Sequence, residues 1–142
     1  MVLMPAYSGT PLPKKLGIRP GSRTYIRNLP AEVRTELGTA LAACDVTDAL
    51  RRAVDFAMVF SRSRAELATT MGRVARWLTP TGMVWAAWPK KGSGEEGELD
   101  DRSVREVGLS VGLVDVKVCS VSEIWSALKF VRRVLDRPRK PS

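Results

Sequence analysis

The segment Trp88-Pro89-Lys90-Lys91 contains the side chains best suited to binding a ligand. An indole ring can stack on a planar group, and two ammonium groups beside it can hold an anion. The same lysines can instead pair with the three glutamates that follow in a glycine-rich stretch, Glu95, Glu96 and Glu98. Two interpretations stay open: a contact for a ligand or partner, and a solvated loop that neutralises its own charge.

Other polar side chains follow stretches that the sequence predicts to be strands. Ligands of open α/β sheets bind beyond the carboxyl ends of the strands, where the strand order reverses. The candidate ligand-binding residues at these ends are Asn28, Asp48, Ser61, Arg62, Trp88, Lys90 and Lys91.

Several catalytic chemistries are excluded by residue type. The chain has no histidine, which removes the most common general base and zinc ligand and the Ser-His-Asp triad. Its 2 cysteines, Cys44 and Cys119, lie far apart without a CxxC pair and are interpreted as small buried side chains. Asp100 and Asp101 are interpreted as the start of a helix. We therefore expect no catalytic residue and no metal site.

The net charge of +8 comes from the two ends of the sequence. Residues 1–30 contain five basic side chains and no acidic one, and residues 132–142 contain five basic and one acidic. Such ends can contact the phosphates of a nucleic acid, although they can equally be solvated tails. No apolar run approaches the roughly 20 residues that span a bilayer, and residues 1–13 lack the pattern of a signal peptide. We expect a cytoplasmic protein that does not enter the membrane.

Strand and helix patterns alternate between a flexible leader over residues 1–13 and a basic tail over 134–142. Residues 14–133 are predicted to form one domain. Residues 54–60 form an apolar run typical of a strand buried on both faces. Ser63 and Glu66 form the pattern of a capping box, before apolar residues at helical spacing. The strands at 113–118 and 125–132 are joined too closely for a parallel crossover, so we expect an antiparallel pair.

In full, the predicted strands are 23–28, 43–47, 54–60, 83–88, 113–118 and 125–132, and the predicted helices are 30–41, 63–78 and 100–112. This order resembles class I S-adenosylmethionine (SAM)-dependent methyltransferases, shortened by a strand and a helix. It implies an α/β fold: a small open, mostly parallel, Rossmann-like sheet flanked by helices and ending in an antiparallel strand pair.

Particular stretches are similar to those of a small bacterial domain family of unknown function, itself methyltransferase-like. They are KLGIRPGSR (15–23), SRAEL (63–67), WAAWPKK (85–91), VREVGLSVGLVDVKVCSV (104–121) and WSALKFVRR (125–133). In methyltransferases an acid after the second strand holds a ribose hydroxyl. The resemblance offers Asp45 or Asp48 for that role, with a turn or cap as the alternative.

One departure from methyltransferases concerns the turn after the first strand. Their turn is rich in glycine, which lets the backbone approach the cofactor closely. Here the turn is Arg27-Asn28-Leu29-Pro30-Ala31, in which leucine adds bulk and proline lacks an N–H. From this turn we expect no cofactor, and SAM binding in particular is disfavoured.

These observations favour a non-catalytic, methyltransferase-like domain that binds a small ligand or a protein partner at the carboxyl ends of its strands. Two alternatives are a divergent SAM-dependent methyltransferase and a weak nucleic-acid binder acting through the basic ends. Self-association through an exposed strand edge or a tryptophan face is compatible with the first interpretation.

Overall fold

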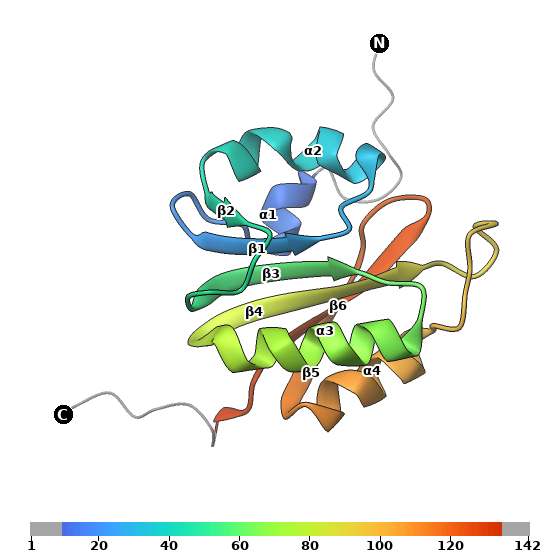
Figure 1. The fold of residues 1–142 in the computed structure, drawn as a ribbon. Coiled ribbons are helices and arrows are strands. Elements are labelled where there is room, and N and C mark those ends of the chain that lie inside the picture. The colour runs from blue at the N-terminus through green and yellow to red at the C-terminus, as the bar shows by residue number, and fades with distance from the viewer. Residues whose placement is uncertain (1–9, 135–142) are drawn as a thin grey trace, which may run out of the picture.

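The computed structural model describes residues 10–134, which form a six-stranded sheet with helices on both faces (Figure 1). The predicted α/β fold class is confirmed. The helices are α1 (Leu12–Leu16), α2 (Ala31–Ala42), α3 (Arg64–Trp77) and α4 (Asp101–Ser110). The strands are β1 (Arg23–Arg27), β2 (Asp45–Thr47), β3 (Val54–Phe60), β4 (Leu78–Pro89), β5 (Leu113–Ser120) and β6 (Trp125–Arg132).

The strands lie in the order β2-β1-β3-β4-β6-β5. From β2 to β4 all neighbours are parallel, whereas β6 runs antiparallel to both β4 and β5. The antiparallel pair predicted at the end of the chain is therefore confirmed. In addition, β6, the last strand along the chain, lies between two strands that precede it.

Alternation along the strands divides the core into two layers. In β3, Phe56, Met58 and Phe60 pack with α1 and α2, while Ala57 and Val59 pack with α3 and α4. Because successive side chains of a strand point to opposite faces, a strand buried on both faces is apolar at nearly every position. The sheet is thus covered by α1 and α2 on one face and by α3 and α4 on the other (Figure 1).

Helices α3 and α4 begin at capping side chains. Asp100 accepts a hydrogen bond from the Ser103 backbone N–H at 2.8 Å, and the Ser103 hydroxyl accepts one from the Asp100 N–H at 2.9 Å. At α3 only half of the predicted box forms. Ser63 accepts from the Glu66 N–H, but the Glu66 carboxylate accepts from the Asn28 side chain. One helix start is thereby tied to the end of β1.

Helix α1 is an element that the sequence patterns did not predict. Its buried Leu12 lies inside the predicted leader, and the remaining described part of that leader is residues 10 and 11. The Trp85 indole N–H donates to the Leu16 carbonyl at 2.9 Å, which fixes the helix to the sheet. Gly17 ends the helix with a φ of +80°, a conformation that favours glycine. Residues 1–9, and the predicted tail beyond residue 134, lie outside the described residues.

The connection from β2 to β3 crosses β1 without a helix, over residues 48–53 (Figure 1). Parallel crossovers usually need a dozen or more residues, but β2 is only 3 residues long, so the path back is short. The Thr47 hydroxyl accepts from the Ala49 N–H at 3.1 Å, which turns the chain. Arg23 donates to the Ala53 carbonyl at 3.1 Å, and its N–H donates to Asp55. With no further strand inserted here, β2 is left as an edge of the sheet.

Candidate functional site

The strand order changes direction at β1, because β2 lies on one side of it and β3 on the other. Such a switch point, at the carboxyl ends of the strands, is where open α/β sheets bind ligands. Asn28 follows β1, Asp48 follows β2, and Ser61 follows β3. Trp88 lies at the end of β4, and Lys90 follows it. The predicted residues are thus at strand ends, but they do not gather in one place.

A hollow of about 610 Å³ opens at the carboxyl ends of β1 and β2, beside α2; we call it the β1–β2 hollow. This volume lies within the range of sites that bind small molecules. Asn28 and Asp48 are the two predicted site residues that line it. Its full lining is Ile26, Asn28, Leu29, Arg34, Leu41, Ala42, Val46, Thr47 and Asp48.

Asn28 holds the turn between β1 and α2 in an unusual backbone conformation. Its φ of +59° is left-handed, a region that asparagine tolerates better than most residues other than glycine. The side-chain amide donates to the Phe60 carbonyl at 3.2 Å and to the Glu66 carboxylate at 3.0 Å. Asparagine therefore adopts this left-handed conformation in the turn, and its side chain joins β1 to β3 and α3.

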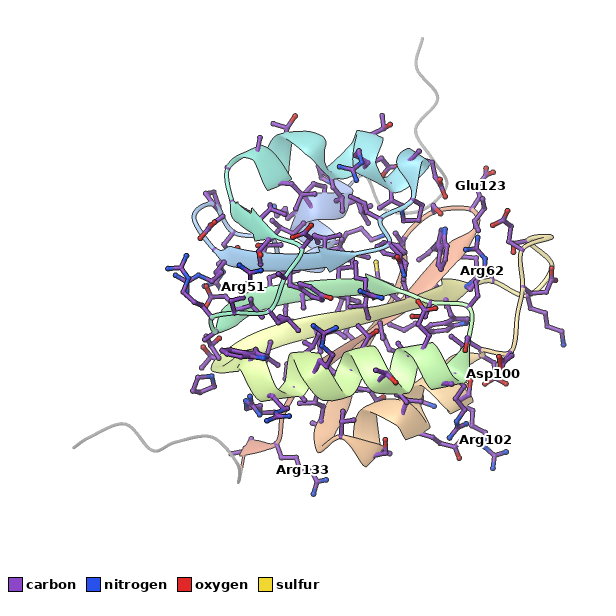
Figure 2. The ribbon with its side chains drawn as sticks, viewed as in Figure 1. Arg51, Arg62, Asp100, Arg102, Glu123 and Arg133 are labelled. Atoms are coloured by element: carbon purple, nitrogen blue, oxygen red, sulfur yellow. The ribbon has the colours of Figure 1, made fainter. Side chains whose placement is uncertain are left out.

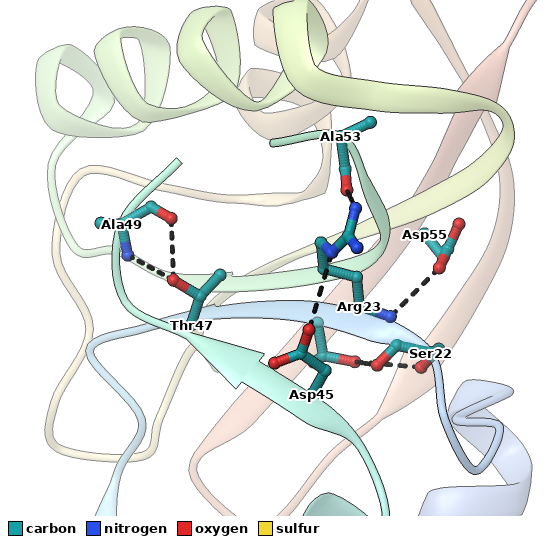
Figure 3. Close-up of polar contacts among 8 residues, drawn as sticks. Ser22, Arg23, Asp45, Thr47, Ala49, Ala53 and Asp55 are labelled. Carbon is teal, nitrogen blue, oxygen red and sulfur yellow. Dashed lines mark hydrogen bonds and ion pairs between the residues drawn. The ribbon is translucent and has the colours of Figure 1, made fainter. Parts of the chain in front are cut away.

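The two aspartates offered for a ribose role occupy different ends of β2. Asp48 follows the strand and lines the β1–β2 hollow. Asp45 begins the strand, and its carboxylate lies 3.7 Å from the Arg23 Nε (Figure 3). Of the two, only Asp48 is placed to accept a hydrogen bond from a ligand in the hollow.

Ser61 and Arg62 belong to a closed part of the same edge. The Ser61 N–H donates to the Ala87 carbonyl at 3.0 Å, and Ser61 is buried. Arg62 pairs with Glu95, and its guanidinium lies 5.0 Å from the ring centroid of Trp125. Figure 2 shows Arg62 on the side of the molecule where the segment after β4 lies.

Residues 90–99 pack over these strand ends. The Glu98 N–H donates to the Arg62 carbonyl at 3.3 Å, and the Lys90 N–H donates to the Ile124 carbonyl at 2.6 Å. A Cβ added at Gly97 would lie 2.7 Å from the Arg62 carbonyl oxygen, so this approach requires glycine. The Ser61 N–H, the Arg62 carbonyl and the Lys90 N–H at the ends of β3 and β4 are therefore bonded within the protein.

The structure separates the three residues of the Trp88-Lys90-Lys91 motif. Trp88 is buried among the residues under α3 and α4 and offers no ring face to a ligand. Lys90 donates to the Ser120 hydroxyl at 2.6 Å, whereas Lys91 lies exposed in the following turn. The loop glutamates have other partners: Glu95 pairs with Arg62, and Glu96 accepts from the Gly92 N–H. The loop glutamates thus pair with Arg62 and with the Gly92 N–H, and a ligand contact through Lys90 and Lys91 stays a prediction.

Arg34 and the apolar wall of the hollow were missed by the sequence analysis. Arg34 lies one turn into α2, and Leu41 and Ala42 lie at its other end. Only the packing of α2 beside the short β2 brings these positions to Asp48. The spacing of apolar residues identifies Leu41 as part of the apolar face of α2. The same spacing does not indicate that Arg34 faces a hollow.

Within residues 10–134, no group of three or more His, Cys, Asp or Glu side chains is placed to hold a metal ion. Over the same residues, no helix combines the length and apolar character needed to cross a bilayer. Cys44 and Cys119 are free thiols, the first partly exposed and the second buried.

Several solved structures with the same fold are methyltransferases. A putative type 11 methyltransferase from Sulfolobus solfataricus matches with a TM-score of 0.57 and 14% identity, over 90% of this chain and 93% of that one. Magnesium protoporphyrin IX methyltransferase from Synechocystis PCC 6803 with bound SAM matches with 0.57 and 9%, over 86% and 74%. A putative methyltransferase from Thermoplasma acidophilum matches with 0.54 and 8%, over 82% and 70%. At these identities the likeness concerns the fold.

These comparisons correct the expectation that the domain takes no cofactor. The fold is that of proteins solved with SAM or with S-adenosylhomocysteine (SAH), so the expectation of no cofactor is wrong as a conclusion about this fold. The glycine-free turn does not by itself exclude a cofactor. It concerns one turn only, and the β1–β2 hollow with Asp48 lies beside it.

A family model covers most of the domain. Residues 24–134 match the model described as "Protein of unknown function (DUF3052)". No curated protein sequence matches the chain. The chain therefore belongs to the DUF3052 family, a domain of unknown function with a methyltransferase-like fold.

Proposed function

We propose that this domain binds an adenosyl ligand of the SAM and SAH class in the β1–β2 hollow and acts as a ligand-binding, regulatory module. The observation that carries the proposal is the meeting of Asp48 with an apolar wall at the switch point of the sheet. A carboxylate accepts two ribose hydroxyl hydrogens well, and an aliphatic wall suits the faces of a purine.

The residues of the hollow fit the nucleoside half of such a ligand. Ile26, Leu41 and Val46 supply apolar surface, and the exposed fraction of Val46 is 46%, a large value for valine in a strand. A bound purine would cover that surface. When bound, SAM supplies a methyl group that its sulfonium activates. The residues that line the β1–β2 hollow would hold the nucleoside part of the molecule.

The fit to the amino-acid half is poorer. In the turn after β1, Pro30 has no N–H to donate. The side-chain amide of Asn28 already donates to the Phe60 carbonyl and to the Glu66 carboxylate. Residues 90–99 also occupy the ends of β3 and β4, beside which a methyl acceptor would have to lie. Both features support binding without methyl transfer.

Calorimetric titration of the protein with SAH and with adenosine tests the proposal. We expect saturable binding of both, with similar affinity, because the nucleoside half makes the contacts. Asp48→Asn should weaken binding about tenfold, the effect of losing a charged hydrogen-bond acceptor. Asp45→Asn is the matched control, since it removes the same charge from the other end of β2, and it should leave binding unchanged.

Two results would overturn the proposal. Absence of saturable heat with both ligands would remove the adenosyl site. Binding of SAH without adenosine would show that the amino-acid half is held, and would favour the divergent methyltransferase.

A further inference from the structure

Three segments of the chain meet at the end of α3, at the edge of the sheet where β3 and β4 begin. Val54, which begins β3, pairs with Leu78, which follows α3 and begins β4. Arg132, at the end of β6, donates to the Ala75 carbonyl at 2.7 Å and to the Leu78 carbonyl at 2.6 Å. The segment before β3, the last turns of α3 and the end of β6 therefore lie close together.

Each of these segments presents arginine side chains to solvent. Two exposed arginines precede β3, two lie in the second half of α3, and one follows β6. Figure 2 shows the first of them, Arg51, and the last, Arg133, on the side of the molecule away from Arg62. Together with the tryptophan that ends α3, we call these residues the arginine patch: Arg51, Arg52, Arg73, Arg76, Trp77 and Arg133.

The five arginines of the patch keep their charge uncompensated by neighbouring side chains. Within residues 10–134, the ion pairs that form between side chains all use other arginines. Asp45 and Asp55 lie at the same edge of the sheet, and both face Arg23: the first is 3.7 Å from its Nε, and the second accepts from its backbone N–H at 3.1 Å. The patch therefore attracts an anion, and it repels the same patch of a second copy of the chain.

Trp77 differs from the tryptophans elsewhere in the chain. Trp85, Trp88 and Trp125 are all buried, with exposed fractions of at most 6%. The exposed fraction of Trp77 is 38%, and Trp77 belongs to neither layer of the core. Arg73 lies four residues before it on the same helix, a spacing that makes two side chains neighbours. An accessible indole ring is thus held beside positive charges at the surface.

We infer that the arginine patch binds single-stranded nucleic acid, with an unpaired base stacked on the Trp77 indole and phosphates bound by the arginines. Guanidinium groups stay charged at every physiological pH and match phosphate oxygens with two parallel hydrogen bonds. Aromatic rings stack on bases of any sequence, but the base must be unpaired, because a duplex keeps its base faces in its own stack.

The composition of the patch favours this ligand over a lipid surface. Insertion into a membrane interface requires an apolar face, whereas the side chains that flank Trp77 on the surface of α3 are Arg73 and Arg76. Five of the six patch residues also lie outside the two basic ends of the sequence. The patch is therefore a surface of the folded domain, separate from the β1–β2 hollow.

The test is fluorescence anisotropy with a short, end-labelled single-stranded oligonucleotide, in DNA and RNA versions of one sequence. We expect saturable binding that weakens steeply with added salt. Trp77→Ala should weaken binding about tenfold, the effect of losing one stacked base. Trp77→Phe should keep most of the affinity, because a phenyl ring also stacks on a base. Binding of either version supports the inference, and a preference between them identifies the sugar that is favoured.

Charge variants test the phosphate contacts. Arg73→Gln should weaken binding and lower the slope of log affinity against log salt by about one, the effect of losing one phosphate contact. Arg102→Gln is the matched control, since Arg102 is an exposed arginine of α4 that lies away from Arg51 and Arg133 (Figure 2). It should keep the parent affinity and salt slope. Thermal melts establish that each variant is folded.

Four results would overturn the inference. Equal loss in Arg102→Gln and Arg73→Gln would show diffuse attraction by the net charge. Unchanged binding by Trp77→Ala would remove the stacking, and equally tight binding of a duplex would remove the preference for an unpaired base. Binding to vesicles of phosphatidylserine and phosphatidylcholine, without binding to either oligonucleotide, would favour a membrane surface. Asp48→Asn should leave oligonucleotide binding unchanged, so the patch and the hollow can fail independently.

Discussion

The carboxyl edge of the sheet has two unlike halves. At the ends of β1 and β2 the strands are 5 and 3 residues long, and a hollow of about 610 Å³ opens beside them. At the ends of β3 and β4, strands of 7 and 12 residues are covered by residues 90–99. Figure 1 shows this covering segment beyond the ends of β3 and β4.

The difference shows how a short crossover redistributes a binding edge. The short crossover over residues 48–53 leaves β2 as an uncovered edge, and the hollow lies next to it. Strands β3, β4 and β6 contain much of the buried core, including Met58, Trp85 and Phe130. Stability is therefore expected to reside in the half that contains β3 to β6, and ligand binding in the half that contains β1 and β2.

The largest predicted effect is in the stable half. Gly108 of α4 lies against the Phe130 ring, and a Cβ added there would lie 2.0 Å from a ring carbon. We expect Gly108→Ala to lower the free energy of unfolding by about 3 kcal/mol, because a buried ring must move. Urea denaturation measures this change. A loss near zero would mean that α4 is loosely seated on the sheet.

A smaller effect is expected where the covering segment is fastened. Arg62→Gln removes the ion pair with Glu95 and the stacking on Trp125. Since the Arg62 side chain is 55% exposed, we expect a loss of only about 1 kcal/mol. Hydrogen exchange should accelerate at Glu98, whose N–H donates to the Arg62 carbonyl. Arg64→Gln, which breaks the comparable pair with Glu106, is the control and should leave Glu98 protected.

In the half that contains the hollow, a glycine-to-alanine change should raise the stability of the protein instead of lowering it. Gly38 lies inside α2 and has no atom within 4 Å of an added Cβ. We expect Gly38→Ala to raise stability by about 0.5–1 kcal/mol, because alanine loses less backbone entropy in a helix. Thermal denaturation beside Gly108→Ala makes the contrast direct. A lower melting temperature for Gly38→Ala would contradict this expectation, because it would mean that the added methyl group clashes with a neighbouring atom.

The smallest effect is a pH dependence at the start of α4. Hydrogen bonds from the backbone N–H and then the hydroxyl of Ser103 lower the pKa of Asp100 below its ordinary value of 3.8. Its stabilising contribution is thus present above 3.8 and is lost as the pH falls through the folded-state pKa. Asp100→Asn keeps a capping side chain without the charge. Melting temperatures from neutral to acid pH should converge for the two proteins, and a gap that widened on acidification would contradict the assignment.

Sequence patterns predicted the elements that make repeated contacts. The spacing of Leu67, Met71 and Val74 predicted α3, and the apolar run of β3 predicted a strand buried on both faces. Helix α1 escaped prediction because five residues with two buried leucines make no periodic pattern. Trp85 and Trp88 lie three residues apart in β4 and therefore face opposite sides of the sheet, and both are buried because helices cover each face.

The sites were harder to predict because side chains distant in sequence form them. Asn28 and Asp48 were predicted from their positions after strands, a local signal, and both line the β1–β2 hollow. The place of Arg34 in the hollow depends on where α2 docks, which residue spacing does not encode. The turn at Pro30 led to a wrong prediction. It differs from the glycine-rich turn of methyltransferases, and this local difference was taken to exclude the cofactor altogether.

The position of β6 between β4 and β5 has a consequence for how the chain folds. During synthesis, β4 is complete well before residues 125–132 exist, so one apolar edge of the sheet has no partner meanwhile. Such edges are sites of aggregation, and pairing across long sequence separations is slow. Folding of this domain is therefore expected to be limited by the arrival of its last strand, and chaperone binding should concentrate on nascent chains that end before Trp125.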